Sequence, residues 1–499
     1  MNKFKNSQFI NKITFGLIVV VFSFIIGFLV YYNFIFGLAV VLSLLLAILM
    51  ATNFRLGLIL VILSVICGQL VRIPVPGEEY GVILLSDVMV IFLIFFWAIS
   101  HLSELLRQDK NKFLLPASPI NWLILIFFVI ALISLLTASG HLFFNELLTS
   151  SFYLVRLVSY VSLYFVILDL GREREEINYY LSWLIGLGVI VAILGFIQLI
   201  FFPDFTFMWI KYGWDPHYMR LLATFFDPNY VGGFLTIILS LTISMYFFIR
   251  SPRKKIILIA LGAILFLALI LTYSRSSLLA FLIAFLIIGI FKSRKLLLLG
   301  AILVILIPLI FPRIKDRLEE SFSGIDKSVQ GRLESWQNTW RVIEDHPIIG
   351  VGYNTYAYTM AEYGLARGVI PETGVTPQAL GGSDSSLLTI WVTTGTIGLV
   401  IYLAIYLTIL GQSFKSFLNK RFSPSLRGFS LGLFAAIIAI LIHSQFVNSL
   451  LYPFIMVLIW ILFGLFVAWR NIENEKLNPS TTLRIDGERS RTIKMKNTE

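Results

Sequence analysis

About fourteen long apolar runs occupy most of this 499-residue chain, and they constrain its fold more than any other feature. A helix needs roughly 20 apolar residues to cross roughly 30 Å of hydrocarbon. Runs near this length lie at 13–30, 34–50, 56–71, 86–100, 120–137, 152–169, 179–202, 229–249, 256–272, 276–291, 296–311, 385–410, 428–446 and 451–469. A chain with 58% hydrophobic and 13% charged residues also exceeds what one soluble core can bury. We therefore predict an all-α polytopic membrane protein of about 12 to 14 transmembrane helices, which excludes a soluble enzyme, a disordered chain and a nucleic-acid binder.

The basic residues indicate the orientation of these helices. If the N-terminus is cytoplasmic, more than two thirds of the 39 Lys and Arg residues fall on the inner side, as the positive-inside rule requires. We therefore expect a multi-pass protein of the cytoplasmic (inner) membrane with both termini in the cytoplasm. Five cations in short outer segments or at outer helix ends are not explained by this rule: Arg72, Arg156, Lys211, Arg220 and Arg275.

One long connection divides the chain into four parts. We expect about eleven transmembrane helices in residues 1–311, a large extracytoplasmic loop at 312–384, about three further helices in 385–469, and a disordered cytoplasmic tail of mixed charge at 470–499. The loop contains apolar residues at helical spacing: Val329, Leu333, Trp336, Trp340 and Ile343. This spacing predicts an amphipathic helix that either packs the loop onto the membrane or guides substrate.

Two helices are predicted to start at the outer face beside arginines, and helix N-termini attract phosphates. In RLLATFFDPN, Asp227 is the expected N-cap and Pro228 the first helical residue, with Arg220 just before them. In TYSRSS, Ser274 is the expected cap and Arg275 lies at the membrane boundary. Because guanidinium groups grip phosphate oxygens in a bidentate fork, the two arginines suit a polyprenyl diphosphate. The alternatives are a lipid-phosphate anchor for Arg275 and an ordinary loop charge for Arg220.

A third outer helix start, GGSDSSLLTIW, contains a candidate base. Ser383 or Asp384 is the expected N-cap, but a carboxylate here can also take the proton from a sugar hydroxyl while a diphosphate leaves, so both roles stay open for Asp384. His443 is the rival base, and a buried, hydrogen-bonded histidine is its plainer interpretation. Arg156 lies deeper in its helix, where a functional or paired role is expected, with Glu146 as candidate partner. No residue spacing indicates a metal, and no cofactor is expected.

These motifs resemble those of the O-antigen ligase and polymerase superfamily of bacterial membrane glycosyltransferases. RLLATFFDPNYVGGFL resembles its arginine, threonine-phenylalanine and proline-asparagine element, and TYSRSSLLAF resembles its serine-arginine element. GRLESWQNTWRVIEDHPIIGVGYNTY resembles the start of its large external loop. SDSSLLTIWVTTGTIGL resembles the helix after that loop, with Gly395 and Gly398 as its glycine pair. The resemblance extends over residues 215–400, less than half of the chain.

The resemblance implies metal-independent, inverting transfer of a glycan from undecaprenyl diphosphate to a glycan or lipid acceptor on the outer face of the membrane. It implies that Arg220 and Arg275 contact the diphosphate. We expect catalytic roles for Asp384, Arg275 and Arg220, and membrane lipids but no nucleic acid as further partners. Substrate-binding roles are expected for Arg156, Arg332, Asn229, Ser274 and His443.

One departure from the family's pattern bears on the acceptor. Ligases that act on lipopolysaccharide typically have a histidine, often followed by asparagine, where this chain has Asp384 and Ser385. This difference favours a polysaccharide polymerase, or a ligase for another surface polymer. The alternative from a different class is a flippase that exports the same lipid-linked glycan, but a flippase should show paired halves and charges near the membrane midplane.

Overall fold

The computed structural model describes residues 45–74, 82–106, 118–212, 214–322, 327–365 and 383–477. Within these ranges, ten helices are long and apolar enough to cross a membrane, and they confirm the predicted all-α polytopic membrane fold. They are α4 (Leu85–Leu106), α5 (Pro119–Ala138), α6 (Phe144–Leu170), α7 (Arg174–Phe201), α9 (Pro228–Tyr246), α10 (Pro252–Leu271), α11 (Arg275–Lys292), α16 (Ser386–Leu418), α17 (Pro424–His443) and α18 (Pro453–Leu477). The predicted span at 13–30 lies outside the described residues, and that at 34–50 is described from residue 45 onward.

Several predicted spans have different lengths in the structure. The run at 56–71 forms α3 (Phe54–Cys67) and the 3-10 turn η1 (Gly68–Leu70), and at 1.5 Å per residue α3 is too short to cross the hydrocarbon alone. The run at 296–311 forms α12 (Arg294–Ile310), which has Pro308 inside it. α18 continues to Leu477, so the helix extends beyond residue 469, where the cytoplasmic tail was predicted to begin.

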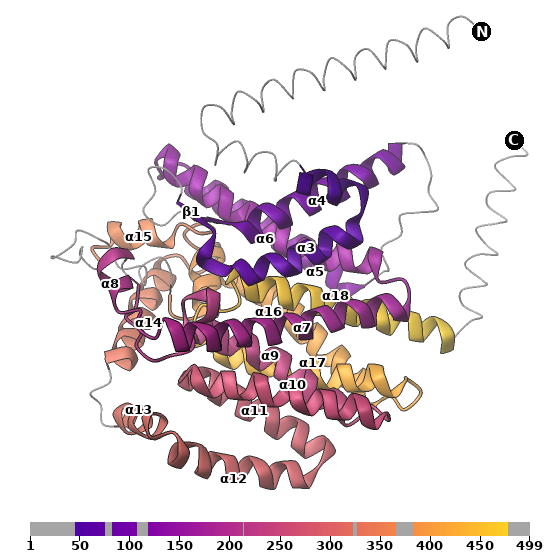
Figure 1. Cartoon of the computed structure of the whole chain (residues 1–499). Coiled ribbons are helices and arrows are strands. Elements are labelled where there is room, and N and C mark those ends of the chain that lie inside the picture. The colour runs from indigo at the N-terminus through magenta and orange to yellow at the C-terminus, as the bar shows by residue number, and fades with distance from the viewer. Residues whose placement is uncertain are drawn as a thin grey trace, which may run out of the picture.

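α18 is the central helix of the bundle. Its most apolar window is 94% buried, and it packs against α6, α7, α9 and α17. A helix that is hydrophobic on all sides is expected to lie inside a bundle rather than at its surface. α9 and α17 form a second close pair, and α12 lies at the edge of the bundle, where Gly300 is its buried residue (Figure 1).

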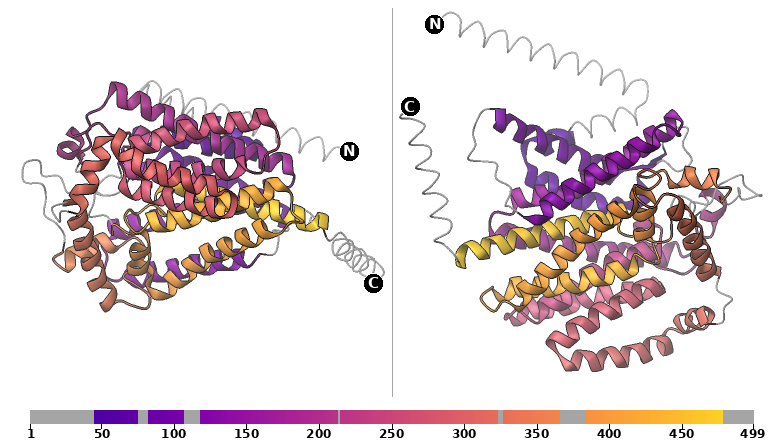
Figure 2. Two further views of the ribbon diagram at one scale, coloured as in Figure 1. Left: turned by 90° about the horizontal axis from the view of Figure 1, so that it is seen from below. Right: turned by 180° about the vertical axis from the view of Figure 1, so that it is seen from behind.

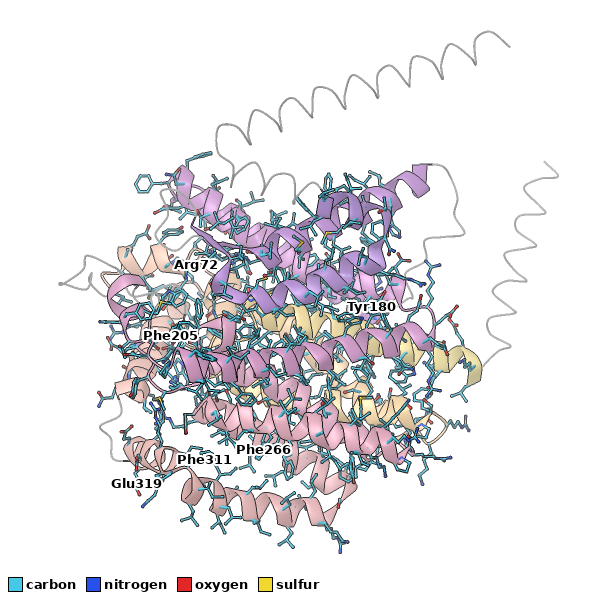
Figure 3. All side chains as sticks on the ribbon, in the orientation of Figure 1. Arg72, Tyr180, Phe205, Phe266, Phe311 and Glu319 are labelled. Carbon is cyan, nitrogen blue, oxygen red and sulfur yellow. The ribbon has the colours of Figure 1, made fainter. Side chains whose placement is uncertain are left out.

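The short elements gather at one end of the bundle, opposite the C-terminal end of α18 (Figure 1). They are the hairpin of β1 (Arg72–Pro74) and β2 (Val82–Leu84), α8 (Phe207–Tyr212), the 3-10 turn η2 (Ala223–Phe225), α13 (Pro312–Phe322), α14 (Lys327–Asp345) and α15 (Tyr356–Glu362). Figure 2 shows the same separation of the long helices from α13, α14 and α15. Arg72 and Phe205 lie at this end, and Tyr180 lies toward the other (Figure 3). The predicted orientation places the short elements outside the cell.

The predicted amphipathic helix in the long connection is present as α14. Its residues Val342 and Ile343 are buried in a small core together with Val392 of α16 and Tyr356 of α15. Trp340 packs edge-on against Trp391, with ring centroids 5.3 Å apart. The apolar face of α14 therefore packs against α15 and α16. A position at the membrane interface stays a prediction.

A close backbone contact fixes this external segment to α16. Val351 and Gly352 donate their backbone N–H groups to the carbonyl oxygens of Val392 and Thr393, at 2.9 and 3.2 Å. α16 is broken at Gly395, which has φ 67° and ψ −176°. A Cβ atom on Gly395 would lie 2.0 Å from the carbonyl oxygen of Ile348, so only glycine fits there. The break makes room for residues 347–352 against the membrane helix.

Candidate functional site

The candidate site is built around the start of α9, and the local sequence explains why the helix begins there. The Asp227 side chain accepts hydrogen bonds from the backbone N–H groups of Asn229 (2.6 Å) and Tyr230 (3.3 Å), and Pro228 follows the cap directly. The predicted cap is therefore confirmed. Burial and the nearby charge of Asp215 raise the pKa of Asp227, against the lowering effect of these two N–H groups.

Arg220 lies beside this cap and is buried. Its Nε donates to the carbonyl oxygen of Thr272 (2.9 Å), and Nη1 lies 3.4 Å from Nδ1 of His217. Burial and the positive charges of Arg317 and Arg313 lower the pKa of Arg220 to about 9, which leaves it charged at neutral pH. The same environment, burial first, lowers the pKa of His217 to about 3, so this imidazole is neutral.

Two arginines of α13 join Arg220 and Arg275 in one group, which we call the arginine cluster. Arg275 Nη1 donates to the backbone oxygen of Arg317 (2.9 Å). Arg313 donates to the carbonyl oxygens of Met219 (2.8 Å) and Tyr218 (2.6 Å), just before Arg220, and its guanidinium lies over the ring of Tyr273. Four guanidinium groups thus gather where α9 and α11 begin.

Sequence reasoning missed Arg313 and Arg317. The available signal is the run PRIKDR, which follows the apolar run of α12 at its outer end. Reading the long connection as a loop hid this signal, because the charges of a loop have no fixed direction. In the structure they belong to the short helix α13, which turns its arginines toward Arg220 and Arg275.

Asn229 and Ser274 link the starts of α9 and α11. Ser274 Oγ donates to Asn229 Oδ1 (2.7 Å) and also accepts from Ser277 N–H, which confirms Ser274 as the N-cap of α11. Ser277 Oγ lies 3.1 Å from His443 Nε2, and His443 Nδ1 lies 3.2 Å from Ser449 Oγ. Both ring nitrogens of His443 are occupied and the residue is fully buried, which favours the plainer interpretation of this histidine.

Asp384 lies directly before the N-cap of α16 and is partly exposed. Its backbone N–H donates to Ser335 Oγ on α14 (3.2 Å). The predicted cap is wrong by one position: Ser385 is the N-cap of α16 and accepts from Leu388 N–H. Asp384 lies within electrostatic range of Tyr230 near the start of α9, and Arg332 lies within electrostatic range of His443. Asp384 therefore does not cap α16.

Several buried polar atoms lie where α14, the start of α16 and the α17–α18 connection come together. Within the part of the chain that the structure describes, Ser383 Oγ, Trp336 Nε1 and Asn448 Oδ1 have no hydrogen-bond partner. The ring of Trp336 lies 6.3 Å from that of Phe446 in the connection. Buried polar atoms are nearly always paired, so these three retain the capacity to hydrogen-bond a polar group that approaches them.

Arg156 is held apart from this group. It forms an ion pair with Asp87 at the start of α4 and also donates to the backbone oxygen of Val82. Tyr160 completes the arrangement by donating to Asp87 Oδ1 (2.9 Å). The expected partner Glu146 is wrong, because its carboxylate accepts from the N–H of Phe143 at the start of its own helix. A substrate-binding role for Arg156 stays a prediction.

The other outer cations have separate positions. The guanidinium of Arg72 lies 4.8 Å from the ring centre of Trp214, a cation–π contact. Lys211 belongs to α8, and its side chain is not described. Among the described residues, no group of three or more His, Cys, Asp or Glu side chains is arranged to hold a metal ion.

The fold and this site define a class: a polytopic membrane protein with a cationic site at the N-termini of membrane helices, beside the short helices α13, α14 and α15. Residues 260–403, from α10 into α16, match the family model described as O-Antigen ligase. The match covers less than a third of the chain, and it confirms the predicted resemblance over these residues. It includes Arg275, Arg313, Arg317 and Asp384 but not Arg220. The search of curated proteins found no match. At the level of the family, the match supports a membrane glycosyltransferase-type function.

Proposed function

We propose that this protein transfers a glycan from undecaprenyl diphosphate to an acceptor on the outer face of the cytoplasmic membrane. The acceptor is the end of a growing surface polysaccharide or another surface molecule. The aspartate at position 384 favours such an acceptor over the lipopolysaccharide core. The reaction proceeds with inversion at the anomeric carbon and without a metal. The observation that carries the proposal is the convergence of the arginine cluster and Asp384 on the start of α9.

The arginine cluster provides the site for the leaving group. A diphosphate leaving group develops negative charge as the bond between the anomeric carbon and the phosphate oxygen breaks. Arg220 and Arg275, with Arg313 and Arg317 beside them, supply fixed positive charge at the height where α9 and α11 begin. The positive ends of the dipoles of α9 and α11 add to the same potential. In this proposal the arginines supply the charge stabilisation that a divalent cation supplies in other transferases.

Asp384 is the proposed base. The acceptor hydroxyl oxygen attacks the anomeric carbon, its proton passes to the Asp384 carboxylate, and the glycosyl–phosphate bond breaks. The position suits this role because Ser385, not Asp384, caps α16, and Asp384 is partly exposed beside α14. Arg332 and the buried polar atoms of Ser383 and Trp336 lie nearby, in the region where we propose that the glycan binds.

The experiment that tests this function uses a strain lacking the protein. Polyprenyl-diphosphate glycans are measured by mass spectrometry, and glycosidase accessibility shows which leaflet holds them. Accumulation on the outer leaflet supports the transferase, because export then works and transfer is missing. Accumulation on the inner leaflet would instead support a flippase, and no accumulation would overturn the choice of donor.

Complementation tests the assigned residues. Arg275→Ala and Asp384→Asn should each restore membrane insertion but not clear the accumulated glycan. Lys315→Gln is the matched control, since Lys315 lies on α13, is exposed and pairs with Glu319 at 3.6 Å rather than with the cluster. Full clearance by both the Arg275 and the Asp384 variants would contradict the site.

A further inference from the structure

A large cavity in the described part of the chain lies at the end of the bundle opposite the arginine cluster. It has a volume of about 870 Å³ and lies between α7, α10 and α17. Its walls are apolar, with residues such as Leu181, Ile185, Phe248 and Leu261. The predicted orientation places its mouth at the cytoplasmic surface. None of the residues assigned to glycan transfer lines it.

The mouth of this cavity is basic and uncompensated. Arg174, Arg250 and Lys254 line it together with the hydroxyls of Ser182, Ser251 and Ser425, and no carboxylate is among the lining residues. Arg174 is held against one wall, where it donates to Ser425 Oγ (3.1 Å) and lies over the ring of Trp469. The Arg250 and Lys254 side chains are exposed.

A neighbouring cavity has a different charge balance, because carboxylates line it together with its arginines. It has a volume of about 300 Å³ and is lined by Arg55 and Arg172 together with Asp169, Glu173 and Glu176. Its cations are neutralised inside the protein, because Arg55 pairs with Glu176 and Arg172 with Asp169. The larger cavity has no such partner for its charges among its lining residues, so these cations remain available to an anion from outside the protein.

We propose that this cavity binds one anionic phospholipid of the inner leaflet, with its phosphate at Arg174, Arg250 and Lys254 and the upper part of its acyl chains between α7 and α10. Basic pockets between transmembrane helices at the cytoplasmic side suit anionic headgroups. The apolar walls suit acyl chains, and the hydroxyls at the mouth can bind phosphate or headgroup oxygens. Small-molecule sites span about 300–1,000 Å³, so the volume suffices for a headgroup and the first chain segments.

Gly186 provides a steric test that leaves every charge in place. It lies on α7, lines the cavity, and a Cβ atom built on it would meet nothing within 4 Å. Gly186→Leu therefore fills the cavity without a backbone clash, and leucine is a better helix former than glycine. Gly411→Leu is the matched control, because Gly411 on α16 also has open space around its Cβ but does not line the cavity.

The measurement is native mass spectrometry of the purified full chain, titrated with phosphatidylglycerol or with phosphatidylcholine. Wild type should retain one phosphatidylglycerol more tightly than phosphatidylcholine. Gly186→Leu and the double variant Arg250→Gln/Lys254→Gln should each weaken that binding at least about tenfold. Gly411→Leu and Arg253→Gln/Lys420→Gln, which remove equal charge from exposed residues outside the cavity, should bind as wild type.

Three results would overturn the lipid site: equal retention of the two lipids, unchanged binding in Gly186→Leu, or equal loss in both charge variants. The last result would indicate a general attraction to positive surface rather than a site. Lipid binding is read without any glycan transfer, so failure here leaves the proposed function untouched, and failure of the proposed function leaves the lipid site standing.

Discussion

Ser277 Oγ lies 3.1 Å from His443 Nε2, and this contact joins α11 to α17 inside the bundle. The imidazole also lies against α9, where a Cβ atom on Gly233 would be 2.9 Å from its ring. One side chain thus contacts α9, α11 and α17, the helices next to the proposed site. His443 positions these helices.

The first prediction separates His443 from Asp384. His443→Ala should lower the free energy of unfolding by roughly 2–4 kcal/mol, because it leaves a cavity and leaves the buried Ser449 hydroxyl without its partner. Asp384→Asn should leave the thermal unfolding midpoint unchanged and abolish transfer. Thermal unfolding and the glycan-clearance assay, run on the same two variants, check both statements. Loss of activity with unchanged stability in His443→Ala would make the histidine the base.

The second prediction concerns the arginines of α13. Arg313→Gln and Arg317→Gln should each weaken donor binding about tenfold, since a hydrogen bond to a charged group contributes roughly 1.5–3 kcal/mol. The turnover rate at saturating donor should change less, if these residues bind the diphosphate without contacting the reacting carbon. Titration with undecaprenyl diphosphate measures the affinity. Lys315→Gln, on the same helix, should bind as wild type, and an equal loss there would mean that charge density alone matters.

The starts of α9 and α11 were predictable from sequence, whereas the start of α16 was not. Asp227-Pro228 and Ser274-Arg275 are local cap signals within a few residues, so the structure agrees with them. In GGSDSS the polar residues are adjacent, and local propensity does not decide among Ser383, Asp384 and Ser385. The decision comes from tertiary contacts, since the Ser386 N–H donates to Ser444 in the α17–α18 connection.

Partners far apart along the chain were beyond sequence reasoning. Asp87, the partner of Arg156, lies 69 residues away in a different helix, whereas the predicted partner Glu146 was chosen for its nearness. The hairpin of β1 and β2 was missed because three-residue strands have too few residues to show alternation. The ten long helices were predictable, because the hydrocarbon thickness fixes their length and composition independently of any partner.

The third prediction tests the buried pair of Arg156 and Asp87. Asp87→Asn should destabilise the protein by about 3–5 kcal/mol, since it leaves a buried guanidinium without its counter-charge. The double variant Asp87→Asn/Arg156→Gln should recover much of that loss. Thermal unfolding measures both. If the recovered double variant also transfers glycan at the wild-type rate, Arg156 is structural; if it is stable but inactive, Arg156 binds substrate.

The fourth prediction concerns the break in α16. Gly395→Ala should destabilise the docked external segment, because its Cβ atom would lie 2.0 Å from the Ile348 carbonyl oxygen in a backbone region that favours glycine. We expect a loss of about 2 kcal/mol or more and faster proteolysis within residues 345–365. Gly411→Ala, on the same helix with open space at its Cβ, should slightly stabilise. Equal proteolysis of the two variants would contradict the docking role.

The last prediction is a pH dependence that arises at His217. Its pKa is about 3 in the folded protein, because of burial and the positive charges of Arg220 and Arg317, against an ordinary value of 6.5. Between these values the unfolded chain binds a proton that the folded chain does not, so stability falls as pH drops from 6.5 toward 3. The upper bound on this loss of unfolding free energy is roughly 5 kcal/mol.

His217→Gln should reduce the slope of the unfolding midpoint against pH in this window, and His346→Gln, at an exposed position, should not. Identical slopes in all three proteins would show that the pKa of His217 is the same in the folded and the unfolded protein. That result would contradict the buried position of this imidazole beside Arg220.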